Sequence, residues 1–343
     1  MQETDSQFYR GLPVKHSGAA LQDAITYVKK RMSGAEKSLD TGFSKLNKSL
    51  TAGLDWNKIF TIAGMSGGGK SITLELIKEN IIHLNSTVDF DVLSFDLEMP
   101  AQDQALRLLS NKLSLSREEL LSLEEPLKLD KLMDIEASSE VLKDRPVYVV
   151  ETPGTSNDIY STIMDFIVTR KLAERQRGLI VTIDHILLTK GGTGEGEKEV
   201  IDNLCKMFVQ LKKECINMKV KIIIIMLSQL NRDIESKERV LNPKIHYPNK
   251  NDLFAASSIY YSSDYVLVTH KPSLISGIDH FYGPARGTKW PKGLPVWNPQ
   301  NPDQAMVYWH LIKNRFGNPN VIIPMLDEFE YSRLAEYTEN DSG

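Results

Sequence analysis

One segment of the chain combines glycines, a lysine and a serine at a spacing suited to binding phosphate. It matches the pattern G-x-x-x-x-G-K-[ST] in full, through Gly64, Ser66, Gly67, Gly68, Gly69, Lys70 and Ser71. Glycines let backbone N–H groups turn towards a phosphate, and a helix starting here would add its positive end. Lys70 would reach the β- and γ-phosphates of a nucleotide, and Ser71 would ligate Mg²⁺. A glycine-rich turn without a ligand is disfavoured, because a strand-like run precedes the pattern and a helical stretch follows it.

Carboxylates end two other apolar runs. Asp184 follows Leu179–Ile183, where a P-loop ATPase holds Mg²⁺ through water. Asp96 and Glu98 lie at the end of another run, where either could polarise an attacking water as a general base. Strand alternation places both on the same side, so spacing alone does not choose between them. The competing interpretation of these carboxylates is helix capping or a surface charge.

A polar segment follows the isoleucine-rich run that ends at Leu227. Its glutamine, Gln229, could sense a γ-phosphate, although a plain turn after a strand would look the same. Nearer the end of the chain, Lys313 and Arg315 stand close to a glycine. Taken alone, these two cations are equally compatible with a solvated surface.

The elements that must position these residues alternate between short apolar runs and longer helical stretches. Continuous apolar runs suit strands covered on both faces, and the order β-α-β-α predicts an α/β fold with a mostly parallel central sheet and helices on both faces. After residue 260 strands follow one another with little helix, which predicts a C-terminal antiparallel extension. The expected strands are Ile59–Ala63, Val92–Leu97, Val147–Val150, Leu179–Ile183, Lys221–Leu227, Tyr265–Thr269, Val307–Ile312 and Val321–Met325, and the expected helices are 71–84, 101–111, 157–177 and 197–217.

Composition shifts predict the domain organisation. Residues 1–37 form an arm followed by an amphipathic helix over 19–32, and residues 38–330 form the α/β domain. Residues 271–305 hold many prolines and glycines and predict a long inserted loop, which also carries Arg286, Lys289, Trp290, Lys292 and Trp297. Residues 331–343 form an acidic tail.

Overall composition excludes several classes of protein. The 343 residues carry 41 Lys plus Arg and 45 Asp plus Glu, a net charge of −4, so the chain is not a basic coat for nucleic acid. Two cysteines, Cys205 and Cys215, lie in one expected helix and favour a reducing cytoplasm over a disulfide scaffold. No run approaches the roughly 18 apolar residues of a transmembrane helix, so we expect no membrane partner.

The joint order of six short motifs carries a family resemblance. They are TGF (41–43), GMSGGGKS (64–71), FDLEM (95–99), IVTID (180–184), LSQLNR (227–232) and KNRFGN (313–318). Over about residues 38–325 the chain resembles the ATPase domain of DnaB-type hexameric replicative DNA helicases. The resemblance implies a RecA-like fold, ATP hydrolysis with Mg²⁺, a homo-hexameric ring and translocation on single-stranded DNA.

The resemblance also implies roles for individual residues. Lys70 and Ser71 match the P-loop pair and Asp184 the Walker B aspartate. Glu98 matches the glutamate taken as the catalytic base, which favours it over Asp96. Gln229 matches the glutamine of the family's SQL motif. Lys313 and Arg315 match a K-x-R pair that reaches into the neighbouring subunit's site, and the 19–32 helix resembles the linker helix that packs on an adjacent subunit.

Several positions depart from the family's pattern. The segment that usually reads like DLRESG has Phe254, Ala255 and Ser257 in place of its arginine, glutamate and glycine, and the YLQ that follows Walker B becomes His185-Ile-Leu. These changes leave DNA contact, loader and primase interactions open. Candidate DNA-binding residues are Lys190 and Lys198 in one glycine-rich loop and Arg232 and Lys250 in a second segment, which also offers Lys237, Arg239 and Lys244.

The favoured function is therefore an ATP-dependent, ring-forming replicative DNA helicase in the cytoplasm of a bacterial cell or phage-infected host, with a primase or loader as further partners. A RecA-type recombinase or regulatory ATPase of the same superfamily would share the P-loop and Asp184. A helicase-related ATP-binding structural or loading factor would fit the altered DNA segment. Stimulation of ATP hydrolysis by single-stranded DNA discriminates among these three.

Overall fold

The computed structural model describes residues 14–186, 189, 191, 195–285 and 290–338. The chain divides into two compact units, the first ending at Ser38 and the second beginning at Leu39. The first unit contains α1 (Ser17–Met32), which begins two residues before the expected helix. None of the residues of α1 is buried, so its apolar stripe of Leu21, Ile25, Val28 and Met32 remains exposed.

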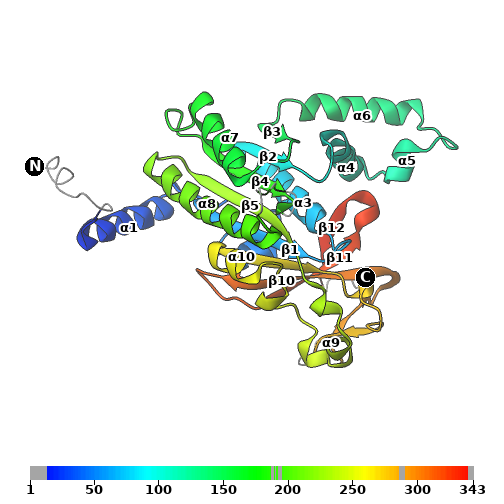
Figure 1. The fold of residues 1–343 in the computed structure, drawn as a ribbon. Coiled ribbons are helices and arrows are strands. Elements are labelled where there is room, and N and C mark those ends of the chain that lie inside the picture. The colour runs from blue at the N-terminus through cyan, green and yellow to red at the C-terminus, as the bar shows by residue number, and fades with distance from the viewer. Residues whose placement is uncertain (1–13, 187–188, 190, 192–194, 286–289, 339–343) are drawn as a thin grey trace, which may run out of the picture. The chain divides into compact units, whose positions relative to one another are not determined.

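The second unit is built around a mixed β-sheet (Figure 1). Within the described residues its strands follow the order β12-β11-β10-β6-β1-β5-β4-β2-β3, and β9 pairs with β10 off this path. The six strands from β6 to β3 in this order pair in parallel, whereas β10, β11 and β12 pair antiparallel. This arrangement confirms the expected α/β class with a mostly parallel sheet and a C-terminal antiparallel extension.

Most strand bounds lie close to those expected, but β10 begins six residues earlier than expected, and β9 and β12 were not expected. The strands of the main sheet are β1 (Lys58–Gly64), β2 (Phe90–Asp96), β3 (Val147–Val150), β4 (Gly178–Asp184), β5 (Ile222–Gln229), β6 (Tyr265–His270), β9 (Trp297–Asn298), β10 (Asn301–Asn314), β11 (Val321–Glu328) and β12 (Arg333–Glu336). The longer helices of this unit are α3 (Lys70–Leu84), α4 (Ala101–Leu113), α6 (Leu129–Leu142), α7 (Ser156–Thr169) and α8 (Glu197–Asn217). Shorter elements are α2 (Ser44–Ser49), α5 (Arg117–Leu121), α9 (Lys237–Leu241), α10 (Ala256–Ser262) and the 3₁₀ turns η2 (Arg232–Glu235), η3 (Pro243–Ile245), η4 (Lys250–Asp252), η5 (Pro272–Leu274) and η6 (Phe329–Tyr331).

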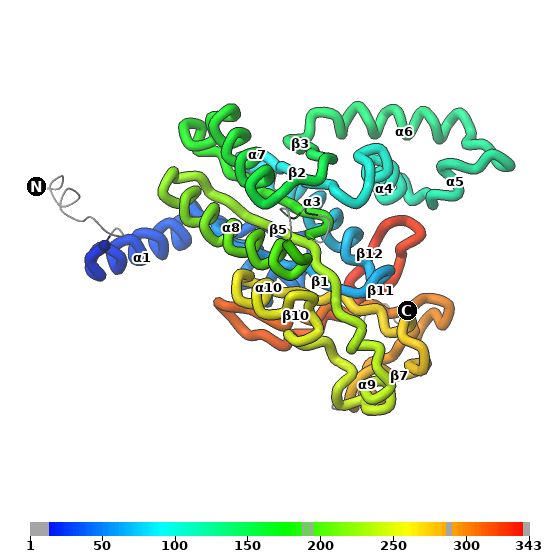
Figure 2. The backbone as a smooth tube through the Cα atoms, in the orientation of Figure 1, coloured from blue at the N-terminus to red at the C-terminus, as the bar shows by residue number. Residues whose placement is uncertain are grey.

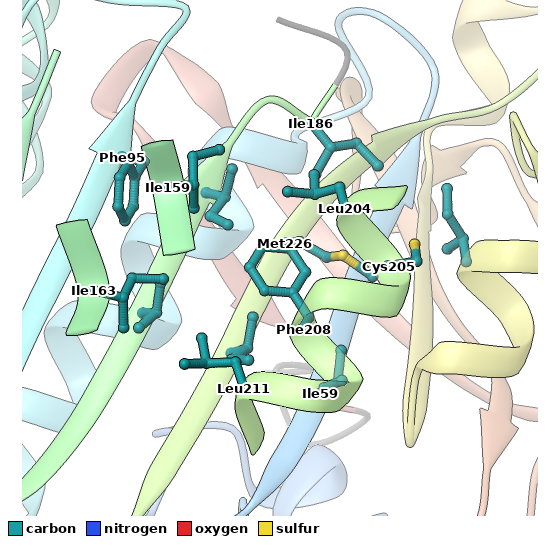
Figure 3. Close-up of a cluster of buried hydrophobic side chains, with 14 of the residues drawn as sticks. Ile59, Phe95, Ile159, Ile163, Ile186, Leu204, Cys205, Phe208, Leu211 and Met226 are labelled. Carbon is teal, nitrogen blue, oxygen red and sulfur yellow. The ribbon is translucent and has the colours of Figure 1, made fainter. Parts of the chain in front are cut away.

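Helices cover the sheet on both faces because the central strands are apolar on both sides. Strand β5 is buried from Ile222 to Ser228, with alternate side chains in two separate cores. One core packs α7, α8 and α10 against the sheet, and the other packs α2 and α3 against its opposite face. Figure 3 shows the first core, where the ring of Phe208 of α8 lies beside Met226 of β5.

One expected helix is shorter than its apolar pattern suggested. Helix α7 ends at Thr169, not near 177, and a turn follows in which Lys171 and Gln176 both have positive φ. Leu172 is fully buried in this turn, and its N–H bonds to the carbonyl of Ile167. The apolar periodicity beyond Thr169 therefore came from a buried turn that returns the chain to β4.

Two segments expected to be irregular are instead folded. The 271–305 segment contains η5, a ribbon formed by β7 (Phe281–Tyr282) and β8 (Leu294–Pro295), β9 and the start of β10. It contributes Ile275, Ile278, Tyr282, Leu294 and Val296 to a third, smaller core. The expected acidic tail begins with β12, which pairs with β11, so residues up to Glu336 belong to the sheet.

The remaining part of the expected tail includes residues 339–343, which lie outside the described residues. Among the helices that are described, none has the length and apolarity needed to cross a membrane.

We expect Phe208→Ala to destabilise the second unit by about 3–5 kcal/mol, because a buried ring is lost and its cavity collapses only in part. Phe208 is fully buried between α8 and the sheet. Urea unfolding followed by circular dichroism measures the change. Val168→Ala, at a position that is 65% exposed, is the control and should change the free energy of unfolding by no more than about 0.5 kcal/mol. Equal effects of the two substitutions would contradict the described core.

Candidate nucleotide-binding site

The glycine-rich segment forms a tight loop between β1 and α3. Gly67 and Gly69 have φ values of +73° and +85°, a conformation that residues with a Cβ rarely adopt. The N–H of Gly68 bonds to the carbonyl of Met65 at 3.1 Å, which closes the loop on itself. Helix α3 then begins at Lys70, so its unpaired N-terminal N–H groups and its positive dipole end lie at the loop. This is the backbone arrangement that binds an anionic phosphate.

Lys70, Ser71 and Asp184 converge beside this loop. The Lys70 ammonium donates to the Met65 carbonyl at 2.9 Å and is electrostatically coupled to Asp184 and Glu98. Burial lowers the pKa of Lys70, while those two carboxylates act in the opposite direction. Ser71 donates a hydrogen bond to the Asp184 carboxylate. The structure thus brings together the lysine, the hydroxyl and the carboxylate that the sequence predicted for this site. Asp184 lies 114 residues after Lys70 in the chain.

Asp184 is buried at the carboxyl end of β4. Its Oδ1 has no hydrogen-bond partner among the described residues. Burial, with the nearby Glu98 as the second cause, raises the pKa of Asp184 to about 6. A buried carboxylate with a free oxygen beside a serine hydroxyl offers the hard oxygen ligands that Mg²⁺ prefers. The residues present therefore fit a magnesium ion held with a nucleotide.

Glu98 and Asp96 lie in different surroundings, although strand alternation did not separate them. Strand β2 ends at Asp96, so the alternation does not extend to Glu98. Asp96 is buried, accepts a hydrogen bond from Ser94 at 2.6 Å and lines a cavity of about 300 Å³ together with Lys78. Glu98 is exposed and acts electrostatically on both Lys70 and Asp184, whereas Asp96 acts on Asp184 but not on Lys70, so Glu98 is the carboxylate coupled to the lysine of the phosphate loop.

Gln229 ends β5 directly beside the start of the loop. Its Cα pairs in register with Gly64, and Leu230 N–H bonds to the Gly64 carbonyl at 3.3 Å. The Gln229 side chain is exposed, and the backbone carbonyl of Gln229 accepts the N–H of Phe254 at 3.0 Å. Gln229 therefore connects the phosphate loop to the 253–257 segment, where the chain departs from the family pattern.

Two residues beside the loop had no signal in the sequence. Thr269, near the end of β6, donates to the Gly68 carbonyl at 2.7 Å and lies so close to Gly64 that any Cβ there would clash. Phe329 of η6 lies against Gly69, where an added Cβ would approach its ring to 2.5 Å. A threonine in a strand and a phenylalanine after a strand are common, so only the folded chain reveals their contacts with the loop.

Lys313 and Arg315 lie at the other edge of the sheet. Strand β10 runs antiparallel to β6, so Lys313 pairs with Val266 and the N–H of Arg315 bonds to the Asp264 carbonyl at 3.0 Å, before β6 begins. The phosphate loop instead adjoins Thr269 at the end of β6. At about 3.3 Å per residue, the strand separates the backbone of Lys313 from the loop by roughly 10 Å and that of Arg315 by roughly 17 Å. Neither cation can reach the phosphate loop of its own chain.

A single buried carboxylate anchors this distant cluster of cations. Asp264 accepts a hydrogen bond from Lys212 at 2.8 Å, and Arg315 Nε lies 3.6 Å from its other oxygen. Arg315 also donates to the Tyr261 carbonyl at 2.9 Å, yet its side chain remains 48% exposed. Lys313 donates to the carbonyl of Tyr260, and burial lowers its pKa to about 8. Arg315 is held in place and still accessible to a neighbour.

The candidate DNA-binding residues fall in several places. Arg232 and Lys250 are exposed on η2 and η4, which the hydrogen bond from Asn231 N–H to the Asp252 carbonyl holds together beside the end of β5. Lys198 is exposed in the first turn of α8, and Lys190 lies outside the described residues. Arg239, offered by the same segment, points inward to Asp252 and to backbone carbonyls, so it is structural.

The fold and the site together define a P-loop nucleotide-binding protein of the α/β class. Residues 38–318 match the model of the DnaB-like helicase C-terminal domain, and the chain belongs to this family. No curated protein sequence matches the chain.

Two solved structures share the fold, which is RecA-like. One is described as an ATPase domain, with a TM-score of 0.70, 16% identity and coverage of 93% of this chain and 99% of that one. The other, described as a DnaB-like replicative helicase and its interactions with primase, has a TM-score of 0.69 and 15% identity. The match covers 92% of this chain and 66% of the other protein's chain.

We expect Asp184→Asn to stabilise the protein without nucleotide or metal by up to about 3 kcal/mol at pH 8. The folded pKa of about 6 lies above the ordinary value of 3.8, so between these pH values only the folded state keeps the proton. Stability of the wild type therefore falls as the pH rises from about 4 to 6, and the deficit persists above 6. Urea unfolding at pH 4 and pH 8 measures it. Asp144→Asn, at an exposed position, is the matched control, and equal stabilities of wild type and D184N at pH 8 would contradict the burial argument.

Proposed function

We propose that this chain is an ATP-driven DNA helicase that forms a ring of six copies and moves along single-stranded DNA. The observation that supports it most is the separation of the phosphate loop from Lys313 and Arg315 across the sheet. Each copy has half of a hydrolytic site at either edge, so a complete site forms where two copies meet. Neighbours arranged head to tail around a closed ring satisfy every such half-site.

The first half of the site would bind the nucleotide. The N–H groups of the Gly64–Gly69 loop and the start of α3 would surround the phosphates, and Lys70 would exchange its bond to the Met65 carbonyl for phosphate oxygens. Ser71 and Asp184 would hold Mg²⁺, which supplies positive charge to the phosphate oxygens when bound.

Glu98 would act on the attacking water. Its exposed carboxylate faces Lys70 and Asp184, where the terminal phosphate would lie, and it would accept the proton that the water loses. Asp96 is already hydrogen-bonded to Ser94 and buried beside Lys78, so it is poorly placed for this role. Gln229 would contact the terminal phosphate and respond to its loss.

The second half of the site would come from the neighbouring copy. Arg315 and Lys313 would place positive charge on the phosphate oxygens as the bond to the leaving group breaks. An arginine supplied in this way accelerates hydrolysis by roughly 10³–10⁵. Hydrolysis would then depend on assembly, and the exposed stripe of α1 offers a further contact with an adjacent copy.

DNA contact would follow from the position of Gln229. The backbone carbonyl of Gln229 accepts the N–H of Phe254, and the adjoining turns η2 and η4 carry Arg232 and Lys250. A movement of Gln229 on loss of the terminal phosphate would therefore move these two cations. Six copies multiply a small local charge, which removes the objection that the whole chain carries a charge of −4. A primase or a loader remains a proposed partner, in the cytoplasm of a bacterial cell or phage-infected host.

The decisive experiment compares ATP hydrolysis with and without single-stranded DNA and then tests unwinding of a forked duplex. We expect stimulation by the single strand and ATP-dependent unwinding. A Lys70→Ala chain should be inactive in both assays, because the negative charge of the nucleotide's phosphates then lacks the ammonium group that would balance it. An assembled ring that hydrolyses ATP without binding or responding to DNA would contradict the helicase function and favour a structural or loading factor.

The trans role of Arg315 can be tested by mixing two inactive chains. We expect Lys70→Ala and Arg315→Ala each to abolish hydrolysis, while R315A keeps most of its affinity for ATP. Rings mixed from the two should recover part of the activity, because the intact phosphate loop of an R315A chain then meets the intact Arg315 of a K70A chain. Hydrolysis by R315A alone, or no recovery in verified mixed rings, would contradict the trans role. Lys219→Ala, which removes an exposed cation between α8 and β5, is the control.

A further inference from the structure

The folded part of the 271–305 segment packs against the segment that carries η2, α9, η3 and η4. Gly283 N–H bonds to His246 Nδ1 at 3.0 Å, and the rings of Tyr247 and Tyr282 lie edge to face with centroids 5.2 Å apart. Gly277 lies so close to Val240 that an added Cβ would reach its side chain at 2.9 Å. Figure 2 shows β7 beside α9 at one end of the molecule. The insertion therefore adjoins the segment in which Arg232 and Lys250 lie.

The ribbon of β7 and β8 has one face in the third core and an opposite face on which Pro295 is buried and Phe281 is partly exposed. Tyr282 pairs with Leu294, and both belong to the third core together with Val296. Phe281 pairs with Pro295 on the opposite face, and strand alternation places Trp297 on that face as well. Phe281 is 42% exposed and Trp297 41% exposed, so both rings keep part of their surface open to solvent.

Trp297 is fixed, because its Nε1 donates to the Asp279 carbonyl at 3.0 Å. The ring is thereby held on the exposed face with little freedom to turn into a core. A fixed aromatic ring with an open face can stack on a flat ligand at a low cost in conformational entropy.

The charge of this segment is positive. From Ile278 to Pro302 the sequence contains Arg286, Lys289 and Lys292 against a single acidic residue, the exposed Asp279 beside Trp297. Among the described residues, the Lys292 ammonium lies 5.7 Å from the centre of the Phe281 ring. Positive charge beside open aromatic rings suits a ligand that combines flat rings with anionic groups, whereas a protein partner's apolar face would gain nothing from the lysine.

We propose that the exposed face of this ribbon, with Phe281, Trp297 and Lys292, is an accessory site for single-stranded DNA. The inference rests on the proposed function, because it takes the strand that Arg232 and Lys250 would contact and extends its path onto the insertion. Phe281 and Trp297 stack on bases, and Lys292 contacts a phosphate. Stacking of this kind tolerates any base, as translocation along an arbitrary sequence requires.

The test measures binding of fluorescein-labelled oligothymidylate to the assembled protein with a non-hydrolysable ATP analogue. Phe281→Leu and Trp297→Leu should each weaken binding by about 5- to 100-fold, the loss of one stacked base. Phe281→Tyr and Trp297→Phe keep a ring and should retain most of the affinity, which separates stacking from a structural role. ATP hydrolysis without DNA should be unchanged in all four.

Two further measurements sharpen the result. Lys292→Gln should reduce the dependence of affinity on salt, because one phosphate contact is lost from each engaged copy. An oligonucleotide carrying 5-iodouracil should photo-cross-link to Phe281 or Trp297 in the wild-type protein, with the position read by mass spectrometry.

The outcomes distinguish this inference from the proposed function. If the wild type binds the oligonucleotide and is stimulated by it, but the leucine variants bind equally well and no cross-link maps to the ribbon, the accessory site is wrong and the helicase function stands. If the wild-type ring does not bind single-stranded DNA, both are overturned. Binding lost equally in the leucine and the ring-keeping variants would also overturn stacking as the mode of contact.

Discussion

The reversal of chain direction between β6 and β10 is the constraint on which the proposed chemistry depends. Parallel strands gather their carboxyl ends at one edge, which is why the phosphate loop, Glu98, Asp184 and Gln229 meet there. An antiparallel neighbour ends at the opposite edge, and β10 therefore delivers Arg315 there. The same topology that gathers the phosphate-loop residues keeps Arg315 away from them within one chain, which is why the proposed hydrolysis requires a second copy.

Burial explains two properties of the proposed half-sites, the raised pKa of Asp184 and the fixed position of Arg315. Asp184 keeps an oxygen without a partner and a raised pKa, which disfavours its charge until a cation is bound. At the other edge, Asp264 accepts from Lys212 and from the N–H of Ile59 and keeps Arg315 in place while the guanidinium stays accessible. Both groups of residues are thus held in place by the fold, and in the proposed function each would complete its charge balance with a ligand or with the neighbouring copy.

A feature of the site could be predicted from the sequence when the residues that determine it are close together in the chain. The phosphate loop was predictable because its glycines, Lys70 and Ser71 are contiguous and their spacing alone determines the backbone path. Glu98 and Asp96 were not separable from the residues alone, because the choice depends on where β2 ends and on the burial of Lys78. Arg239 resembled an available cation, yet its partner Asp252 lies 13 residues further on, in another element.

By itself the sequence determined the order of strands β1 to β6, β10 and β11 and of helices α1, α3, α4, α7 and α8, the phosphate loop and the α/β class, because apolar periodicity and contiguous motifs act over short stretches of chain. The tertiary structure decided which edge of the sheet each cation occupies, which carboxylate faces the loop and that the 271–305 segment is a folded ribbon. The physical reason is that these properties depend on pairing between strands far apart in the sequence. Phe281 and Trp297 are partly exposed because Tyr282 and Leu294, on the other face of the ribbon, pack into the third core.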